Sequence, residues 1–183
     1  MSLLVISCSL NPMSLSRILA RSALTRLRAM DAEPEWIDLR EMPLPLCDGD
    51  TASDDPNAKR LVEKVTEANG ILLATPVYNY NVSAATKNLV ELTGSAWTDK
   101  VVGFLCAAGG RSSYMAPMSL ANSLMLDFRC IVIPRFVYAS EDAFEGDSIA
   151  DEVIRERLDE LVHALVRITR ALYPVSVEAK RDV

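Results

Sequence analysis

Short apolar runs, each followed by a longer segment with helical spacing of its apolar residues, are the strongest constraint on the fold of this chain. Four runs are apolar throughout: Leu3–Ile6, Ile71–Ala74, Val101–Ala107 and Cys130–Ile133. Strands of this kind are typical of parallel sheets that are covered on both faces. A fifth run, Glu35–Leu39, alternates between polar and apolar residues and fits a strand near the sheet edge.

Helices are expected after each of these strands. Asp55 before Pro56 reads as an N-cap followed by proline at the first helical position, and Ser83 is a second good N-cap. The first expected helix contains the apolar residues from Ile18 to Leu27. The other four run from Asp55 to about Ala68, Ser83 to about Leu92, Met115 to Phe128, and Ser148 to Leu172. Pro76 and Pro134 are expected to end the third and fifth strands, because proline has no N–H for a ladder hydrogen bond.

Five β–α units in succession predict an α/β fold, a three-layer sandwich with a five-stranded parallel sheet and helices on both faces. Right-handed crossovers favour the doubly wound strand order 2-1-3-4-5. We expect one domain over residues 1–175, followed by a polar tail at residues 176–183.

Composition limits the classes of partner. The chain has 183 residues, a net charge of −6 and a pI of about 4.9, which argue against a nucleic acid or an anionic membrane as the main partner. No signal peptide and no membrane span is expected. The four cysteines form no C-x-x-C pair and no zinc-binding frame, so we expect reduced thiols in a cytoplasmic protein. We interpret His163, the single histidine, as a partly buried helix residue.

A serine-rich segment follows the first strand and precedes the first helix. The hydroxyls of Ser9, Ser14 and Ser16 lie where a strand–loop–helix connection directs free N–H groups at an anion. The segment contains neither G-x-G-x-x-G nor G-x-x-x-x-G-K-[ST], so the dinucleotide fingerprint and the P-loop are excluded. A loop without lysine suits a terminal monophosphate held by neutral donors. A helix cap and a turn explain Ser14 and Ser16 equally well.

Two more loops follow strands of the predicted sheet. Residues 77–81, Val-Tyr-Asn-Tyr-Asn, combine two phenols with two amides, which suit a flat heteroaromatic ligand with polar edges. Gly109 and Gly110 form a glycine pair that lets the backbone approach a ligand closely. In the order 2-1-3-4-5 these two loops and the serine loop meet at one crevice. The methionines of the segment from Met115 to Phe128 are interpreted as core filling.

The motifs in these loops resemble those of the NADPH-dependent FMN reductase family of flavodoxin-like proteins, over roughly residues 1–140. The family's G-S-L-[RN]-x-x-S-x-[NS] loop corresponds to residues 8–16, and its T-P-x-Y-N loop to residues 75–79. The resemblance implies that the FMN phosphate is held by Ser9, Asn11, Ser14 and Ser16, and that Pro76, Val77, Tyr78 and Asn79 line the isoalloxazine. Gly109 and Gly110 match the family's G-G loop. The chain departs from the family pattern at Cys8, usually glycine, and at Val77, often glutamate.

This resemblance implies an NAD(P)H-dependent FMN oxidoreductase. Hydride would pass from the nicotinamide to FMN and on to a small acceptor such as free flavin, a quinone, an azo compound or a metal oxyanion. No catalytic side chain and no metal are expected, because the cofactor carries the chemistry. Arg111 is a candidate for the phosphate of the nicotinamide nucleotide, or an ordinary surface arginine. The family also suggests a homodimer or homotetramer.

Two alternatives stay open from the sequence. The first is a flavodoxin-like electron carrier with no nicotinamide activity of its own, which the acidic pI would suit. The second is a binding module that uses the serine loop for a different phosphate, since a fold does not determine a function.

Overall fold

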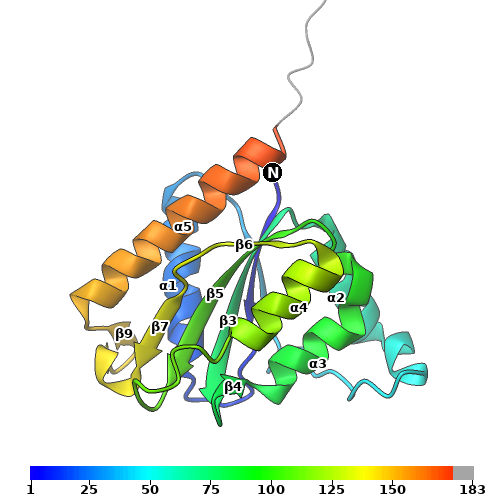
Figure 1. Cartoon of the computed structure of the whole chain (residues 1–183), viewed down its shortest axis with the longest axis horizontal. Helices are drawn as coiled ribbons and strands as arrows, with labels where there is room; N and C mark the ends of the chain where they lie inside the picture. The colour runs from blue at the N-terminus through cyan, green and yellow to red at the C-terminus, as the bar shows by residue number, and fades with distance from the viewer. Residues whose placement is uncertain (175–183) are drawn as a thin grey trace, which may run out of the picture.

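The computed structural model describes residues 1–174, so the predicted polar tail at residues 176–183 lies outside the described part. Figure 1 shows a central sheet with helices on both faces. The strands are β1 (Leu3–Ser7), β2 (Glu35–Asp38), β3 (Gly70–Tyr78), β4 (Asn81–Val82), β5 (Val101–Ala108), β6 (Ile131–Val132), β7 (Val137–Ser140), β8 (Phe144–Glu145) and β9 (Ser148–Ile149). The helices are α1 (Leu15–Ala29), α2 (Pro56–Glu67), α3 (Ala84–Thr93), α4 (Met118–Phe128) and α5 (Glu152–Leu172), with short 3₁₀ turns at Thr51–Asp54, Gly94–Trp97 and Glu141–Ala143.

The main sheet runs in the order β2-β1-β3-β5-β6, with every pair along this path parallel. This confirms the predicted order 2-1-3-4-5, and β2 lies at the edge as expected. The short β4 is antiparallel to β3, and β8 pairs only with β9 in a separate hairpin. The sheet therefore places β1, β3 and β5 side by side at its centre.

The fifth predicted strand is broken into two pieces. Val102 of β5 pairs with Val132 of β6, but Leu105 of β5 already pairs with Val137 of β7. Two residues of β5 therefore lie opposite the four residues 133–136. Pro134 lacks an N–H, and Arg135 has a left-handed backbone with φ of 60°. The chain bulges at this point and then rejoins the same edge of β5.

The prediction that Pro76 ends the third strand was wrong, because β3 continues through it to Tyr78. Pro76 stays in register with Ala107 of β5. The carbonyl of Ala74 accepts a 2.8 Å hydrogen bond from the N–H of Cys8, so Ala74, and Pro76 two residues later, face β1. Since β1 ends at Ser7, the missing N–H of Pro76 points to a side without a ladder partner.

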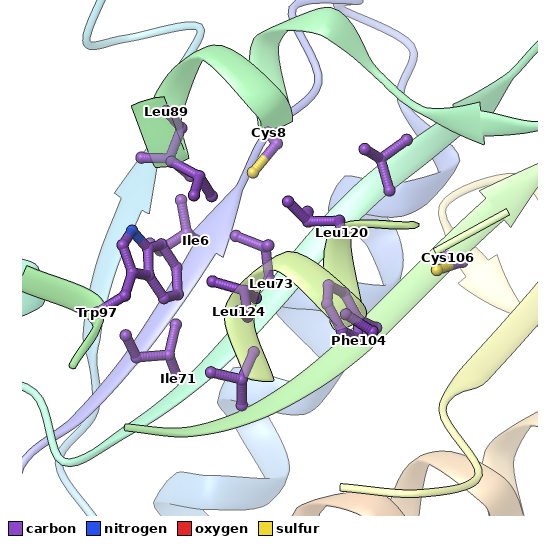
Figure 2. Packing of buried hydrophobic residues seen from close by; sticks show 14 of the residues in the cluster. Ile6, Cys8, Ile71, Leu73, Leu89, Trp97, Phe104, Cys106, Leu120 and Leu124 are labelled. Atoms are coloured by element: carbon purple, nitrogen blue, oxygen red, sulfur yellow. The ribbon is translucent and has the colours of Figure 1, made fainter. Parts of the chain in front are cut away.

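Two apolar clusters cover the two faces of the sheet. Alternate residues of β1 belong to different clusters: Leu4 and Ile6 pack with α2, α3 and α4, whereas Leu3 and Val5 pack with α1 and α5. Figure 2 shows the first cluster, in which the fully buried Trp97 lies close to Ile6 and Ile71. Burial on both faces explains why these strands are apolar at every position.

The helix caps follow the sequence closely at three places. The side chains of Ser14, Asp55 and Ser83 each accept a hydrogen bond from a backbone N–H in the first turn of the helix that follows. The predicted starts of the last two helices were too early. Residues before Pro117 form turns, so α4 begins only at Met118. The β8–β9 hairpin occupies the predicted start of α5, which begins at Glu152 after the N-cap Asp151.

Three side chains are more exposed than expected. Met115 precedes α4 and Met125 lies on its outer face, with 50% and 37% of their surface exposed, whereas Leu120 and Leu124 face the sheet. The expectation of core filling was therefore wrong for both methionines. His163 is on a helix as expected but is exposed rather than partly buried. Within residues 1–174, no helix is both long and apolar enough to cross a membrane.

Candidate functional site

Three loops meet at the carboxyl edge of the sheet, because they leave three adjacent parallel strands. Ser7 at the end of β1 is in register with Ala74 of β3, and Pro76 of β3 is in register with Ala107 of β5. The serine loop (residues 8–14), the Tyr–Asn loop (residues 78–81) and the glycine loop (residues 109–117) follow these positions. Ligands of open α/β sheets bind at such an edge, where the strand order reverses.

The serine loop is held by its own side chains. The hydroxyl of Ser9 accepts from the N–H of Asn11, and the amide oxygen of Asn11 accepts from the N–H of Met13. The hydroxyl of Ser14 caps α1 and lies 3.0 Å from the hydroxyl of Ser16. Ser16 is fully buried and Ser9 is 2% exposed, whereas Asn11 is exposed. The assignment of these four residues to a phosphate stays a prediction. Ser16 would act indirectly, by holding the hydroxyl of Ser14 in place.

Arg17 is the main feature of this loop that the sequence analysis missed. Its guanidinium donates 2.7 Å hydrogen bonds to the carbonyls of Ser9 and Asn11, at two points of the serine loop. It also pairs with Asp38 at the end of β2. Arg17 is 6% exposed and points inward, so it braces the loop from inside the protein instead of offering its charge to solvent. The sequence around Arg17 did not indicate this inward orientation, because its partner Asp38 is distant in sequence.

The Tyr–Asn loop is a tight hairpin between β3 and β4. Tyr78 pairs with Asn81, and the two residues between them are left-handed, with φ of 49° at Asn79 and 63° at Tyr80. Two such residues define the type I′ turn that suits the twist of a hairpin. Tyr78 is 53% exposed, whereas Val77 is 7% exposed and Pro76 is buried. Of the four residues predicted beside the isoalloxazine, Tyr78 and Asn79 therefore present side chains to solvent.

A buried set of hydroxyls lies beneath this hairpin. The hydroxyl of Thr86 lies 2.7 Å from that of Thr75 and 2.8 Å from that of Ser83. Thr75 also accepts from the N–H of Ser83. The Cys8 thiol shares this region, and its burial raises its pKa to about 12, so it stays protonated at neutral pH. These contacts connect the end of β3 with the start of α3 on either side of the hairpin.

The glycine loop presents open backbone at the same edge. A Cβ atom on Gly109 or Gly110 would meet no atom within 4 Å. The phenol of Tyr138 donates a 2.6 Å hydrogen bond to the carbonyl of Gly110, which fixes the pair from the β7 side. A flat ligand could therefore lie close to this backbone.

Arg111, which follows the glycine pair, is 2.6 Å from a carboxylate oxygen of Asp142, and both side chains are largely exposed. A hydrogen bond from Ser140, and then one from Arg111, lower the pKa of Asp142. Exposed ion pairs of this kind are weak, so Arg111 is free to exchange this partner for another anion.

The family model for NADPH-dependent FMN reductases matches residues 1–145 of this sequence. The chain belongs to this family. An NAD(P)H-dependent FAD/FMN reductase of Geobacillus thermodenitrificans is 28% identical over 154 residues, covering 82% of this chain and 83% of the relative. An NADPH:quinone oxidoreductase of Arabidopsis thaliana is 29% identical over 180 residues, covering 91% of each chain. The crystal structure of an NADH:FMN oxidoreductase superposes with a TM-score of 0.78 at 18% identity, covering 96% of this chain and 91% of that one, which supports the fold.

Membership of this family makes the protein an NAD(P)H-dependent oxidoreductase with FMN as its flavin. The donors at the carboxyl edge fit that cofactor. The serine loop carries buried hydroxyls at Ser9 and Ser14 and an exposed amide at Asn11, and the Tyr–Asn hairpin presents a phenol and an amide to solvent. The open backbone at Gly109 and Gly110 leaves room for a planar ring.

Proposed function

We propose that FMN binds in the crevice between the serine, Tyr–Asn and glycine loops and that NAD(P)H reduces it there. One observation carries this proposal: the three loops leave adjacent parallel strands, β1, β3 and β5. The bound flavin would supply the redox chemistry, which requires no acid, base or metal from the protein. The protein itself would bind the flavin, orient it toward the nicotinamide and shield it from water.

The phosphate of FMN would be held at the start of α1. Ser9, Asn11 and Ser14 would surround it, with Ser16 fixing the Ser14 hydroxyl. The first N–H groups of a helix lack intrahelical partners and favour an anion. Since Arg17 is paired with Asp38, this cage would hold the phosphate through neutral donors.

The flavin ring would lie between the Tyr–Asn and glycine loops. Tyr78 and Asn79 would contact it through their side chains, and Pro76 and Val77 through the backbone. The N–H groups of Gly109 and Gly110 would face its polar edge. Arg111 would bind the phosphate of the nicotinamide nucleotide in exchange for its exposed contact with Asp142.

Titration of the purified protein with FMN, and with riboflavin as the control, tests the site. We expect saturable FMN binding and much weaker riboflavin binding, because riboflavin lacks the phosphate. Equal affinities would contradict the phosphate assignment to the serine loop. Failure of both flavins to bind would contradict the whole crevice.

The acceptor is proposed to be a small oxidised molecule, such as free flavin, a quinone, an azo compound or a metal oxyanion. The runner-up is an electron carrier that depends on another enzyme for its electrons. Oxidation of NADPH by the FMN-loaded protein, with a quinone as the only acceptor, separates the two. Steady turnover without another protein supports the reductase, and its absence supports the carrier.

We further propose that the active form is a homo-oligomer that buries the outer surface of α4. Leu126 and the adjacent Met125 are 84% and 37% exposed near the C-terminal end of this helix, and Met115, just before its start, is 50% exposed. Apolar side chains grouped in this way are typical of a contact surface. Light scattering should give a dimer or tetramer for the native chain and a smaller species for Leu126→Glu. A native monomer would contradict this proposal.

A further inference from the structure

A cleft of about 480 Å³ opens between α1 and the β8–β9 hairpin. Its floor begins at Pro12, Met13 and Ser14, which belong to the serine loop, and it continues along α1 as far as Arg26. Sites for small organic ligands usually have volumes of about 300–1,000 Å³. The cleft is therefore large enough for a nucleoside, and it starts at the proposed phosphate position.

One stripe of α1 lines this cleft. Ser14, Ile18, Ser22 and Thr25 recur at the spacing of one helical face, and Arg21 lies beside them. Ile149 of the hairpin adds an apolar side chain from the other wall. Beyond Ser14, the stripe therefore offers apolar surface and two hydroxyls, with the cation of Arg21 beside them, in a row that leads away from the serine loop.

The charges around the cleft favour an anion. In the part of the chain that the structure describes, no carboxylate lies within ion-pair distance of Arg21 or Arg155, and Arg155 instead donates to the carbonyls of Ile149 and Ala150. Arg26 is paired with Asp159, and Asp147 contributes the one carboxylate of the lining. Arg21 is exposed, and its charge is available about two turns of α1 beyond the serine loop.

A phosphate site made of neutral donors would accept a singly charged phosphate as well as a doubly charged one. A cage of neutral donors, with Arg17 turned inward to Asp38, does not depend on the second negative charge of a terminal phosphate. FAD is FMN whose phosphate is joined to AMP, so each of its two phosphates carries a single charge. A protein that binds FAD needs a path that leaves the first phosphate, and the cleft provides one.

We propose that this cleft binds the adenylate half of FAD, so that the protein takes FAD as well as FMN into one flavin site. The second phosphate would lie near Arg21. The adenosine would contact Ile18 and Ile149 and the hydroxyls of Ser22 and Thr25. The inference rests on the proposed flavin site, because it uses the serine loop as its starting point.

Calorimetric titration of the intact protein with FMN and with FAD tests the cleft. We expect FAD to bind within about tenfold of FMN in the native protein. Arg21→Glu should lower the affinity for FAD by about tenfold, because one attractive contact becomes repulsive. It should leave the affinity for FMN within about twofold of the native value. Thr25→Trp, which fills the cleft from an exposed position, should also weaken FAD selectively. Arg28→Glu is the matched control, since Arg28 is an exposed arginine of α1 outside the cleft.

Each result has one meaning. FMN binding together with FAD binding at least 100-fold weaker overturns the adenylate cleft and leaves the flavin site standing. Equal losses for FMN and FAD in Arg21→Glu, or the same loss in Arg28→Glu, also overturn it. A rise in KM for NADPH but not NADH in Arg21→Glu, with FAD affinity unchanged, assigns the cleft to the nicotinamide nucleotide instead. Absence of FMN binding removes the flavin site and this inference together.

Discussion

Arg17 and Asp38 form a two-pronged buried ion pair, with Nε 2.5 Å from one carboxylate oxygen and Nη2 3.2 Å from the other. Their side chains are 8% and 4% exposed. The pair joins the end of β2 to the first turn of α1, and the remaining guanidinium hydrogens bind carbonyls of the serine loop. Asp38 therefore orients the arginine, and the arginine shapes the loop.

Removing one member of this pair should be costly. Arg17→Ala leaves a buried carboxylate without its partner, so we expect a loss of about 3–5 kcal/mol in the free energy of unfolding. The double variant Arg17→Gln/Asp38→Asn carries no buried charge and should retain the fold. In that variant FMN affinity should fall several-fold with riboflavin affinity unchanged, because the loop geometry matters to the phosphate. An equal loss for both flavins would show a purely structural role.

The hydroxyl of Thr86 is fully buried between those of Thr75 and Ser83, so we expect it to contribute to stability. Thr86→Val leaves the hydroxyls of Thr75 and Ser83 with fewer partners in a buried site, and we expect a loss of about 1–3 kcal/mol in urea unfolding. Thr86→Ser should recover most of it. Thr25→Val, on the exposed side of α1, is the control and should change stability by less than about 0.5 kcal/mol. A neutral Thr86→Val would contradict the network.

The hairpin turn carries backbone strain at Tyr80, where φ is 63°. Asparagine tolerates this conformation better than tyrosine, so Tyr80→Asn should raise the free energy of unfolding by about 0.5–1 kcal/mol. Asn79→Val, which places a β-branched residue at φ of 49°, should lower it. Chemical unfolding of both variants tests the turn, and a stabilised Asn79→Val would refute its assignment.

Two glycines of β5 and its loop should behave in opposite ways. Ala at Gly109 would project into open space, so Gly109→Ala should fold normally but bind FMN at least about tenfold more weakly through steric contact with the ring. At Gly103 a Cβ would lie 2.9 Å from Leu72 Cδ2, and Gly103→Ala should cost about 1–3 kcal/mol of stability. Calorimetry and thermal melting distinguish the two effects. Undiminished FMN affinity in Gly109→Ala would place the ring elsewhere.

The buried thiols make stability depend on alkaline pH. Burial raises the pKa of Cys8 from an ordinary 9.0 to about 12, and that of Cys130 to about 11. Above pH 9 the unfolded chain loses these protons while the folded chain keeps them, so the free energy of unfolding should fall from about pH 9 upward. Cys8→Ala should flatten this decline.

Thiol labelling checks the same burial at a single pH. At pH 8, Cys47 should react with a disulfide reagent in the native protein, and the three buried cysteines only after unfolding. Rapid native labelling of Cys8 would contradict the packing beneath the hairpin.

Local sequence determined the elements and most of their ends. Apolar runs identified β1, β3 and β5. The caps at Asp55 and Ser83 were readable, and the cap of α1 was narrowed to Ser14 or Ser16, because a cap uses residues within one turn of each other. Handedness and strand succession then predicted the sheet order, and so the meeting of the three loops.

Tertiary structure decided what depends on distant partners. Pro76 stays inside β3 because β1 has already ended beside it, and Arg17 turns inward because Asp38 arrives from another strand. The breaking of the fifth strand and the exposure of Met125 likewise depend on which surfaces neighbouring elements cover. Local preferences act over a few residues, whereas burial and ion pairing depend on the whole packed arrangement, which no single segment encodes.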